Sequence, residues 1–184
     1  AAVDRLRFAV CGCSHYEAGY FTAFRRLAEE RFDFVFHTGD YIYEGRADGG
    51  RNPGVVRQHA GSEIYSLVDY RNRYALYKAD RDLLAAHASA PFVMTWDDHE
   101  VENDYANGQS ENGDPVESFL QRRAAAYQAY YEHMPLRRTA RPVGPDMRLF
   151  TSATFGDLAH FVLLDNRQHR SDQPCGVPGA LGGR

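Results

Sequence analysis

The sequence predicts an α/β fold in which parallel strands carry polar residues at one edge of a sheet. Three short apolar runs, at residues 6–11, 32–37 and 92–96, each stop at a glycine or at a cluster of polar residues. A helical pattern separates the first two runs, which indicates a βαβ unit with neighbouring parallel strands and a right-handed crossover. Open α/β sheets place their ligands at the carboxyl ends of the strands, so the polar segments mark the expected site.

The first half of the chain alternates between apolar runs and helical patterns. The run 6–11 halts at Gly12, and apolar residues from 20 to 28 then recur at helical spacing. The run 32–37 is rich in aromatic and branched residues, which favours a strand. Residues 45–54 contain turn signals and predict a surface excursion. A long helical pattern with apolar positions from 67 to 84 follows, and Pro91 stops it.

The second half begins with a helix and ends in a stretch rich in Pro and Gly. Asp114 and Pro115 supply an N-cap and a proline at the first helical position, which predicts a helix from Val116 to about His133. Residues 150–155 and 159–164 flank a Gly-Asp turn and are typical of an antiparallel hairpin. From Ser171 onward there is little to bury, so we expect one domain over 1–170 and a tail over 171–184.

The composition is that of one ordinary globular domain. Of the 184 residues, 43% are hydrophobic, which is enough for a single core. The 25 acidic residues outnumber the 21 Lys and Arg residues, which disfavours a nucleic-acid-binding surface. No apolar run reaches the roughly 18 residues of a transmembrane segment, and the first residues lack the pattern of a signal peptide. We therefore expect a soluble chain from which any export signal has been removed.

The strongest chemical signal is the segment Gly39-Asp40-Tyr41-Ile42-Tyr43, directly after the second strand. A carboxylate at a strand tip can bridge two cations, and a tyrosine three residues later can turn back to offer a phenolate oxygen. Because phenolate suits Fe³⁺ better than Zn²⁺ or Mg²⁺, Tyr43 indicates ferric iron. The alternative is that Tyr43 only packs under the loop.

A second signal is Asp97-Asp98-His99-Glu100, at the end of the third strand. Adjacent carboxylates repel each other in a site of low dielectric constant, so this crowding favours cations between them. Asn103 and Asp104 add further oxygen donors just beyond. The alternative is a solvated turn or a helix cap.

The three cysteines, Cys11, Cys13 and Cys175, are too few for a disulfide framework, and whether Cys175 is free or paired stays open. Cys11 lies within the first strand and is expected to be an inert core residue. Cys13 lies past that strand, beside the expected position of Asp40, and fits either a metal thiolate or a core cysteine. The histidines other than His99 have neighbours typical of loops or amphipathic faces and, taken singly, are not expected to be ligands.

Cys13, Gly39-Asp40-x-x-Tyr43 and Asp97-Asp98-His99-Glu100 stand in the order of the three metal-binding blocks of the calcineurin-like metallophosphoesterases. The chain most closely resembles the PhoD-type alkaline phosphatases, in which cysteine replaces the first Asp/His pair and aspartate replaces the usual asparagine of the third block. That family also includes calcium-stimulated phospholipase D enzymes of bacteria. The similarity covers almost the whole chain, including 16–23, 69–78 and 164–168.

The resemblance implies the amino-terminal half of a four-layer α/β/β/α sandwich, with 1–170 as the amino-terminal part of a catalytic domain. It implies that Cys13, Asp40 and Tyr43 hold Fe³⁺. Asp40 would bridge to a second ion, completed by Asp98 or Asn103, for which Ca²⁺ is expected and Zn²⁺, Mn²⁺ or Mg²⁺ are alternatives. The later histidine and aspartate ligands of the superfamily do not follow Arg170, so they are expected from a separate or missing carboxyl-terminal part.

The implied function is metal-dependent hydrolysis of phosphomonoesters or phosphodiesters, with His99 and Asp98 as catalytic residues and residues 44–66 on the substrate side. His99 would face the phosphate or the leaving-group oxygen. Arg71, Arg73 and Arg167 are expected to be ion-pairing or helix-surface residues. The family implies a secreted, periplasmic or cell-wall location in a bacterium. A phosphodiesterase of phospholipase D type and a non-catalytic metal-binding module are the alternatives, whereas a Rossmann domain lacks its G-x-G-x-x-G motif.

Overall fold

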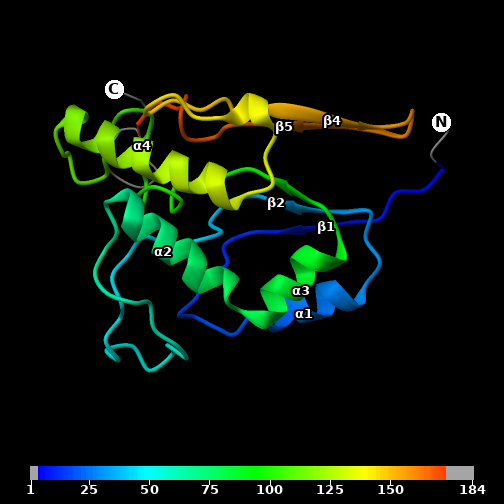
Figure 1. The fold of residues 1–184 in the computed structure, drawn as a ribbon, viewed down its shortest axis with the longest axis horizontal. Helices are drawn as coiled ribbons and strands as arrows, with labels where there is room; N and C mark the ends of the chain where they lie inside the picture. The colour runs from blue at the N-terminus through cyan, green and yellow to red at the C-terminus, as the bar shows by residue number, and fades with distance from the viewer. Residues whose placement is uncertain (1–3, 173–184) are drawn as a thin grey trace.

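The computed structural model describes residues 4–172, and its centre is a three-stranded parallel sheet (Figure 1). The strands lie in the order β1 (Phe8–Cys11), β2 (Phe34–His37) and β3 (Phe92–Met94). Helix α1 (Thr22–Glu29) connects β1 to its parallel neighbour β2, so the predicted βαβ unit is confirmed. The carboxyl ends of all three strands therefore meet at one edge of the sheet.

Helices cover one side of this sheet and a β-hairpin covers the other (Figure 1). Helices α1 and α3 (Arg81–Ser89) pack together on the first side. The hairpin of β4 (Thr151–Phe155) and β5 (Ala159–Leu163) forms a separate antiparallel sheet, as the turn signal predicted. Stacking of Phe34 on Phe155, with ring centroids 4.8 Å apart, joins the two sheets. The described residues thus supply three successive layers of the predicted sandwich, in the order α/β/β.

The single long helix expected from 67 to 84 is wrong, because the segment forms two helices, α2 (Leu67–Lys78) and α3. Asp80 starts the second helix, since its Oδ1 accepts the backbone N–H of Leu83 at 3.1 Å. Arg57 holds the other oxygen of Asp80 at 2.6 Å. Apolar periodicity alone cannot reveal this break, because both helices bury residues in the same core. The aspartate cap outweighs the continuous pattern.

Helix α4 (Val116–His133) has the predicted bounds, but the predicted cap is wrong. Pro115 occupies the cap position and no side chain caps the helix, whereas the Asp114 carboxylate accepts the Ser110 hydroxyl at 3.1 Å. A short 3₁₀ helix, η1 (Arg138–Ala140), leads from α4 toward the hairpin. None of the helices described over 4–172 combines the length and the apolar character that crossing a membrane requires.

The core that joins α2 and α4 to the sheet is built largely from aromatic side chains. Trp96 lies beyond β3 and stacks on Tyr127 of α4, with ring centroids 4.2 Å apart and ring planes within 10°. Tyr70 of α2 donates its hydroxyl to the carbonyl of Val101 at 2.6 Å and accepts from Arg122 at 3.0 Å. The hydroxyl of Tyr70 thus has hydrogen-bond partners inside the core, which allows its large ring to be buried. The bond to Val101 also fixes the segment after β3 against α2.

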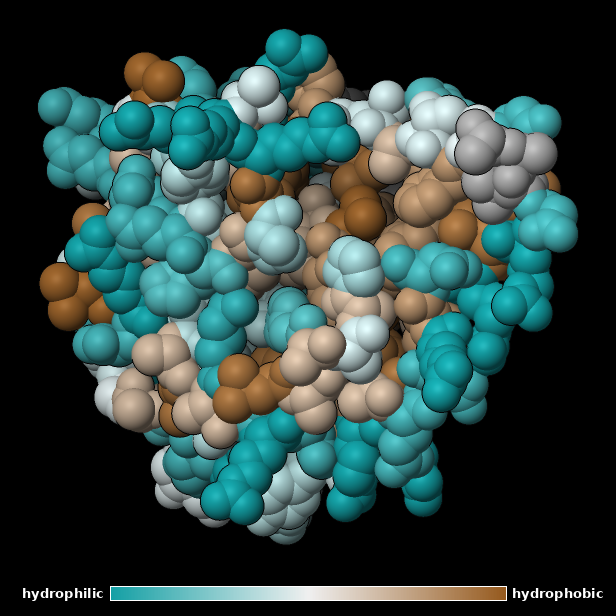
Figure 2. Space-filling view, turned by 45° about the vertical axis from the view of Figure 1, so that its right-hand side comes forward, coloured by the Kyte–Doolittle hydropathy of each residue, from teal (hydrophilic) through white to brown (hydrophobic). Residues whose placement is uncertain are grey.

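Apolar side chains also remain exposed beside the hairpin. Val162 is 63% exposed and Leu164 is 69% exposed. Both line a groove of about 990 Å³ that continues past Leu136 and Phe150. Figure 2 shows apolar residues gathered around a hollow on the face that it presents. Contiguous apolar surface of this kind is commonly covered by another part of a protein or by a partner.

The buried carboxylate of Glu100 ties the loop after β2 to the loop after β3. Glu100 is 1% exposed and accepts the backbone N–H groups of Asp40 at 3.0 Å, Tyr41 at 2.6 Å and Asp97 at 2.9 Å. Burial raises the pKa of Glu100 to about 8, although the hydrogen bond from Tyr41 favours the carboxylate. One side chain therefore sets the spacing of the two loops that carry the candidate ligands.

The first prediction concerns this tie. In Glu100→Gln, an NH₂ group replaces one carboxylate oxygen, so at least one of the three backbone N–H groups loses its acceptor. We expect the free energy of unfolding to fall by about 1–3 kcal/mol, measured by urea denaturation. The control is Glu29→Gln on the exposed face of α1, which we expect to change stability by less than about 0.5 kcal/mol. Equal stability of Glu100→Gln and the native protein would contradict the conclusion that Glu100 holds the two loops together.

Candidate metal centre

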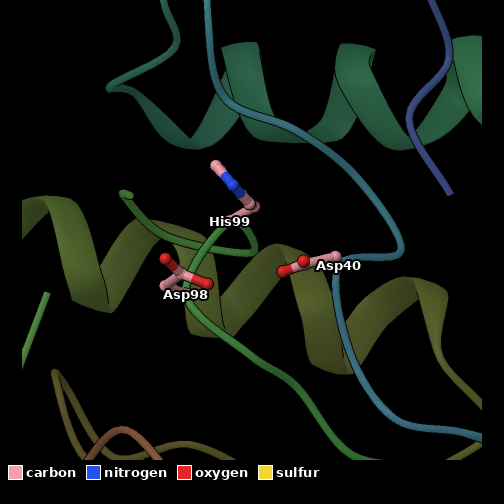
Figure 3. Close-up of side chains that lie close together, drawn as sticks. All are labelled: Asp40, Asp98 and His99. Carbon is pink, nitrogen blue, oxygen red and sulfur yellow. The ribbon is translucent and has the colours of Figure 1, made fainter. Parts of the chain in front are cut away.

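Three side chains converge where the loops after β2 and β3 meet. Asp40, Asp98 and His99 each offer one ligand atom, and these atoms all lie within 4.8 Å of one another. The carboxylates of Asp40 and Asp98 face each other, with His99 beside them (Figure 3). The two loops approach closely because residue 39 is glycine. A Cβ on Gly39 would lie 2.2 Å from the backbone nitrogen of Asp97, and the φ of Gly39 is +118°.

Cys13 and Tyr43 reach the same carboxylate from two further directions. The Sγ of Cys13 lies 3.3 Å from Oδ2 of Asp40, and the hydroxyl of Tyr43 donates to that oxygen at 3.2 Å. Cys13 and Asp40 both have a φ of 54°, in the left-handed region, and the backbone N–H of Cys13 donates to the carbonyl of Gly39 at 3.1 Å. The expectation that Cys13 lies beside Asp40 is confirmed, because β1 and β2 are neighbours.

The electrostatics of these groups fit a cation. The Oδ1 atom of Asp40 is buried and has no hydrogen-bond partner within the described part of the chain. Burial raises the pKa of Asp40, and burial together with Asp40 raises the pKa of Cys13 and of Tyr43. The protein alone therefore disfavours the anionic forms of all three side chains. A cation would reverse that preference, because it binds the deprotonated forms.

Asp98 is held by groups outside the cluster. Its Oδ2 accepts the backbone N–H of Asp104 at 2.6 Å, and its Oδ1 lies 3.3 Å from Nη2 of Arg167. Arg167 also pairs with Asp97 through Nε. The ion-pairing role expected for Arg167 is thus confirmed, and Arg71 likewise pairs with Glu132 at 2.6 Å. These contacts fix the direction of the Asp98 carboxylate independently of any ligand.

Glu44 is the main site residue that the sequence analysis missed. It is buried, and its Oε2 lies 2.8 Å from Nδ1 of His99 while its Oε1 accepts the backbone N–H of Asn103 at 2.7 Å. Burial by itself lowers the pKa of His99, but the hydrogen bond and charge of Glu44 outweigh it and raise the pKa to about 9. The ring of His99 also lies 4.1 Å from that of Tyr43. Only the position of Glu44 directly after Tyr43 hinted at this role.

Three other predicted residues have clear surroundings. The side-chain amide of Asn103 donates to Glu111 at 2.7 Å, so Asn103 touches the site through its backbone. Burial raises the pKa of Cys11 to about 12, in keeping with an inert core thiol. The expectation for Arg73 is wrong: it is buried and donates to backbone carbonyls, which satisfy the guanidinium without a carboxylate. Cys175 and most of the predicted tail lie outside the described residues.

The histidines expected not to be ligands are placed mainly by packing and by hydrogen bonds. His37 ends β2, contacts the Ser14 hydroxyl at 3.3 Å and accepts the N–H of Gly39. Burial lowers the pKa of His37 to about 3, so its ring stays neutral. His15 lies closer to the centre, because its ring packs 4.3 Å from that of Tyr43. The rings of His15 and His99 thus both pack close to the ring of Tyr43.

Comparisons with known proteins place the chain in a family. The sequence profile of the family described as "PhoD-like phosphatase" matches residues 8–182. Alkaline phosphatase D of Bacillus subtilis (strain 168) is 56% identical over 174 residues, which cover 94% of this chain and 30% of that protein. The solved structure of PhoD superposes with a TM-score of 0.92 at 54% identity, covering 96% of this chain and 34% of that one.

This superposition confirms the predicted α/β class and its place in a larger fold, because the chain spans only about a third of the length of these relatives. The match includes the loops after all three parallel strands, where the candidate ligands lie. On the length and identity of the match, the chain belongs to the PhoD-like phosphatase family.

Proposed function

We propose that this chain supplies part of the active site of a metal-dependent phosphoric ester hydrolase acting on phosphomonoesters, phosphodiesters or both. The observation that carries the proposal is the buried carboxylate of Asp40, which has one unpartnered oxygen and receives Cys13 and Tyr43 on the other. The name of the Bacillus subtilis relative, alkaline phosphatase D, supports the same class of reaction. Its bacterial source supports a bacterial enzyme, and we propose a secreted or cell-wall location.

In this proposal, Cys13, Asp40 and Tyr43 would hold Fe³⁺, because a thiolate and a phenolate are good donors to ferric iron. Asp98 or Asn103 would complete a second site with Asp40, for which we propose Ca²⁺, with Zn²⁺, Mn²⁺ or Mg²⁺ as alternatives. Once bound, such ions neutralise phosphoryl oxygens and supply an activated water. Further ligands would come from the rest of a longer protein, whose remaining part we also propose to cover the apolar groove beside Val162.

The residues of this chain orient and protonate the substrate in the proposed reaction. Glu44 engages Nδ1 of His99, so Nε2 is the nitrogen left to meet an ester oxygen. With a pKa raised to about 9, His99 carries a proton at neutral pH and can donate it to the departing alkoxide. Asp98 is held by Arg167 and by the backbone of Asp104, so its carboxylate stays directed at Asp40.

A second prediction separates activity from stability at Asp40. In Asp40→Asn of the full-length protein, we expect kcat/KM for p-nitrophenyl phosphate to fall at least about 100-fold, or roughly 2.7 kcal/mol. The metal-free variant should be as stable as the native protein or more so, because burial and Asp98 already disfavour the carboxylate. The control is Asp157→Asn in the exposed hairpin turn. Native turnover in Asp40→Asn would rule out its proposed role.

The third prediction concerns the colour of the iron-loaded protein. A phenolate bound to Fe³⁺ absorbs visible light, so Tyr43→Phe should weaken the visible band and lower iron affinity by about 10- to 100-fold. Tyr41→Phe is the matched control, because the Tyr41 hydroxyl contacts His87, at 2.9 Å. A colourless protein with full activity and stoichiometric zinc would overturn the ferric proposal.

The fourth prediction tests Cys13 by its reactivity. In the metal-free protein at mildly alkaline pH, iodoacetamide should label Cys13 in preference to Cys11, because Cys13 is exposed, whereas Cys11 is half-buried with a pKa raised to about 12. Loading with iron should then protect Cys13. Peptide mass spectrometry resolves the two sites. Equal labelling of Cys13 with and without bound metal would show that its sulfur is not a ligand.

A further inference from the structure

The segment that follows Tyr43 is a closed loop whose two ends, the neck of the loop, are joined by backbone hydrogen bonds. The backbone N–H of Ile64 donates to the carbonyl of Glu44 at 3.1 Å, and that of Ala47 donates to Gly61 at 3.1 Å. Residues 44–64 therefore leave the site and return to it at the same point. The contacts that hold the two ends of the loop together also fix Tyr43 and Glu44, which lie at its start.

The buried side chain of Arg73 forms hydrogen bonds with both ends of this loop. Arg73 of α2 is 3% exposed, and its Nη1 donates to the carbonyls of Tyr43 and Gly45, while Nη2 reaches Ser62 at 3.4 Å. Within residues 4–172, no carboxylate forms an ion pair with Arg73. A buried guanidinium is costly unless its donors are satisfied, so these carbonyls carry the interaction.

A buried acid holds the far part of the same loop. Glu17 is 4% exposed, and its Oε1 accepts the backbone N–H groups of Asp48 at 3.1 Å and His59 at 2.9 Å. The carbonyl of Glu17 accepts the N–H of Val56 at 2.9 Å. Glu17 thus anchors the body of the loop, and Arg73 contacts the residues that lead into the site.

The contacts of Glu44 show which side chains of the site depend on the hydrogen bonds of Arg73. The two carbonyls that Nη1 engages belong to the residues directly before and after Glu44. The Glu44 carboxylate lies against His99 and the N–H of Asn103, and the Tyr43 hydroxyl lies on Asp40. One guanidinium nitrogen, Nη1, donates to both carbonyls, while the other, Nη2, reaches the carbonyl of Ser62 on the returning part of the loop.

We propose that Arg73 is a positioning residue of the active site: by holding the backbone on both sides of Glu44, it keeps Tyr43 on Asp40 and Glu44 on His99. This inference rests on the proposed hydrolase function. A displacement of about 1 Å at a positioned catalytic group can cost roughly 100-fold in rate. Loss of these hydrogen bonds therefore lowers kcat by about 10- to 100-fold and leaves KM nearly unchanged.

The test compares Arg73→Gln and Arg73→Lys with Arg71→Gln in the full-length protein. Arg71 lies two residues earlier on α2 and pairs with Glu132 at the surface, so its loss should leave all readouts unchanged. The first readout is kcat and KM. The second is amide hydrogen exchange of the metal-free protein, followed at Ile64 and Asn103, whose N–H groups bond to Glu44. Arg73→Gln should lose protection at these two amides, while hairpin amides keep theirs, and Arg73→Lys should lose less because its ammonium keeps the charge and three N–H donors.

Each outcome decides the proposal. Native kcat and native protection of the Asn103 amide in Arg73→Gln would overturn it, because the shorter, uncharged glutamine amide cannot replace the contacts of Nη1 and Nη2. Loss of protection throughout the hairpin as well would also overturn it, since Arg73 would then support the whole fold. If the native protein hydrolyses no phosphate ester, the proposed function fails, whereas the exchange comparison at Asn103 still reports whether Arg73 holds Glu44.

Discussion

The buried carboxylate of Glu100 is the contact on which the geometry of the site depends. Parallel strands bring the ends of β2 and β3 to one edge of the sheet, but the loops beyond them have no ladder to set their spacing. Glu100 sets the spacing of these loops instead, because it accepts two N–H groups from one loop and one from the other. Gly39 permits the approach, since any side chain at that position would meet the backbone of Asp97.

This arrangement assembles acidic groups against their own repulsion. Asp40 is buried with one unpartnered oxygen, and Asp97 and Asp98 are nearby and oppose its ionisation. Arg167 offsets part of the charge from the hairpin side. His99 is drawn toward its charged form by Glu44. The balance disfavours the anionic forms of the ligands at the centre of the site, and a cation would reverse this preference by binding the deprotonated oxygen and sulfur donors.

Much of this could be predicted from the sequence, because the relevant signals are local. The strands end where apolar runs stop, and Cys13, Asp40 and the segment 97–100 follow those ends directly. The break between α2 and α3 escaped prediction because both helices feed one core, and only the cap at Asp80 separates them. Glu44 and Arg73 escaped because their roles arise from partners 55 and 30 residues away in sequence, respectively. Such long-range pairing leaves no periodic trace.

The most direct test of the account is an anomalous diffraction map of the iron-loaded, full-length protein, recorded on both sides of the iron absorption edge. The account predicts an iron peak within bonding distance of the sulfur of Cys13, the phenolic oxygen of Tyr43 and a carboxylate oxygen of Asp40, with Asp98 facing a second ion. Iron bound elsewhere, or bound without Cys13 and Tyr43 among its ligands, would contradict it.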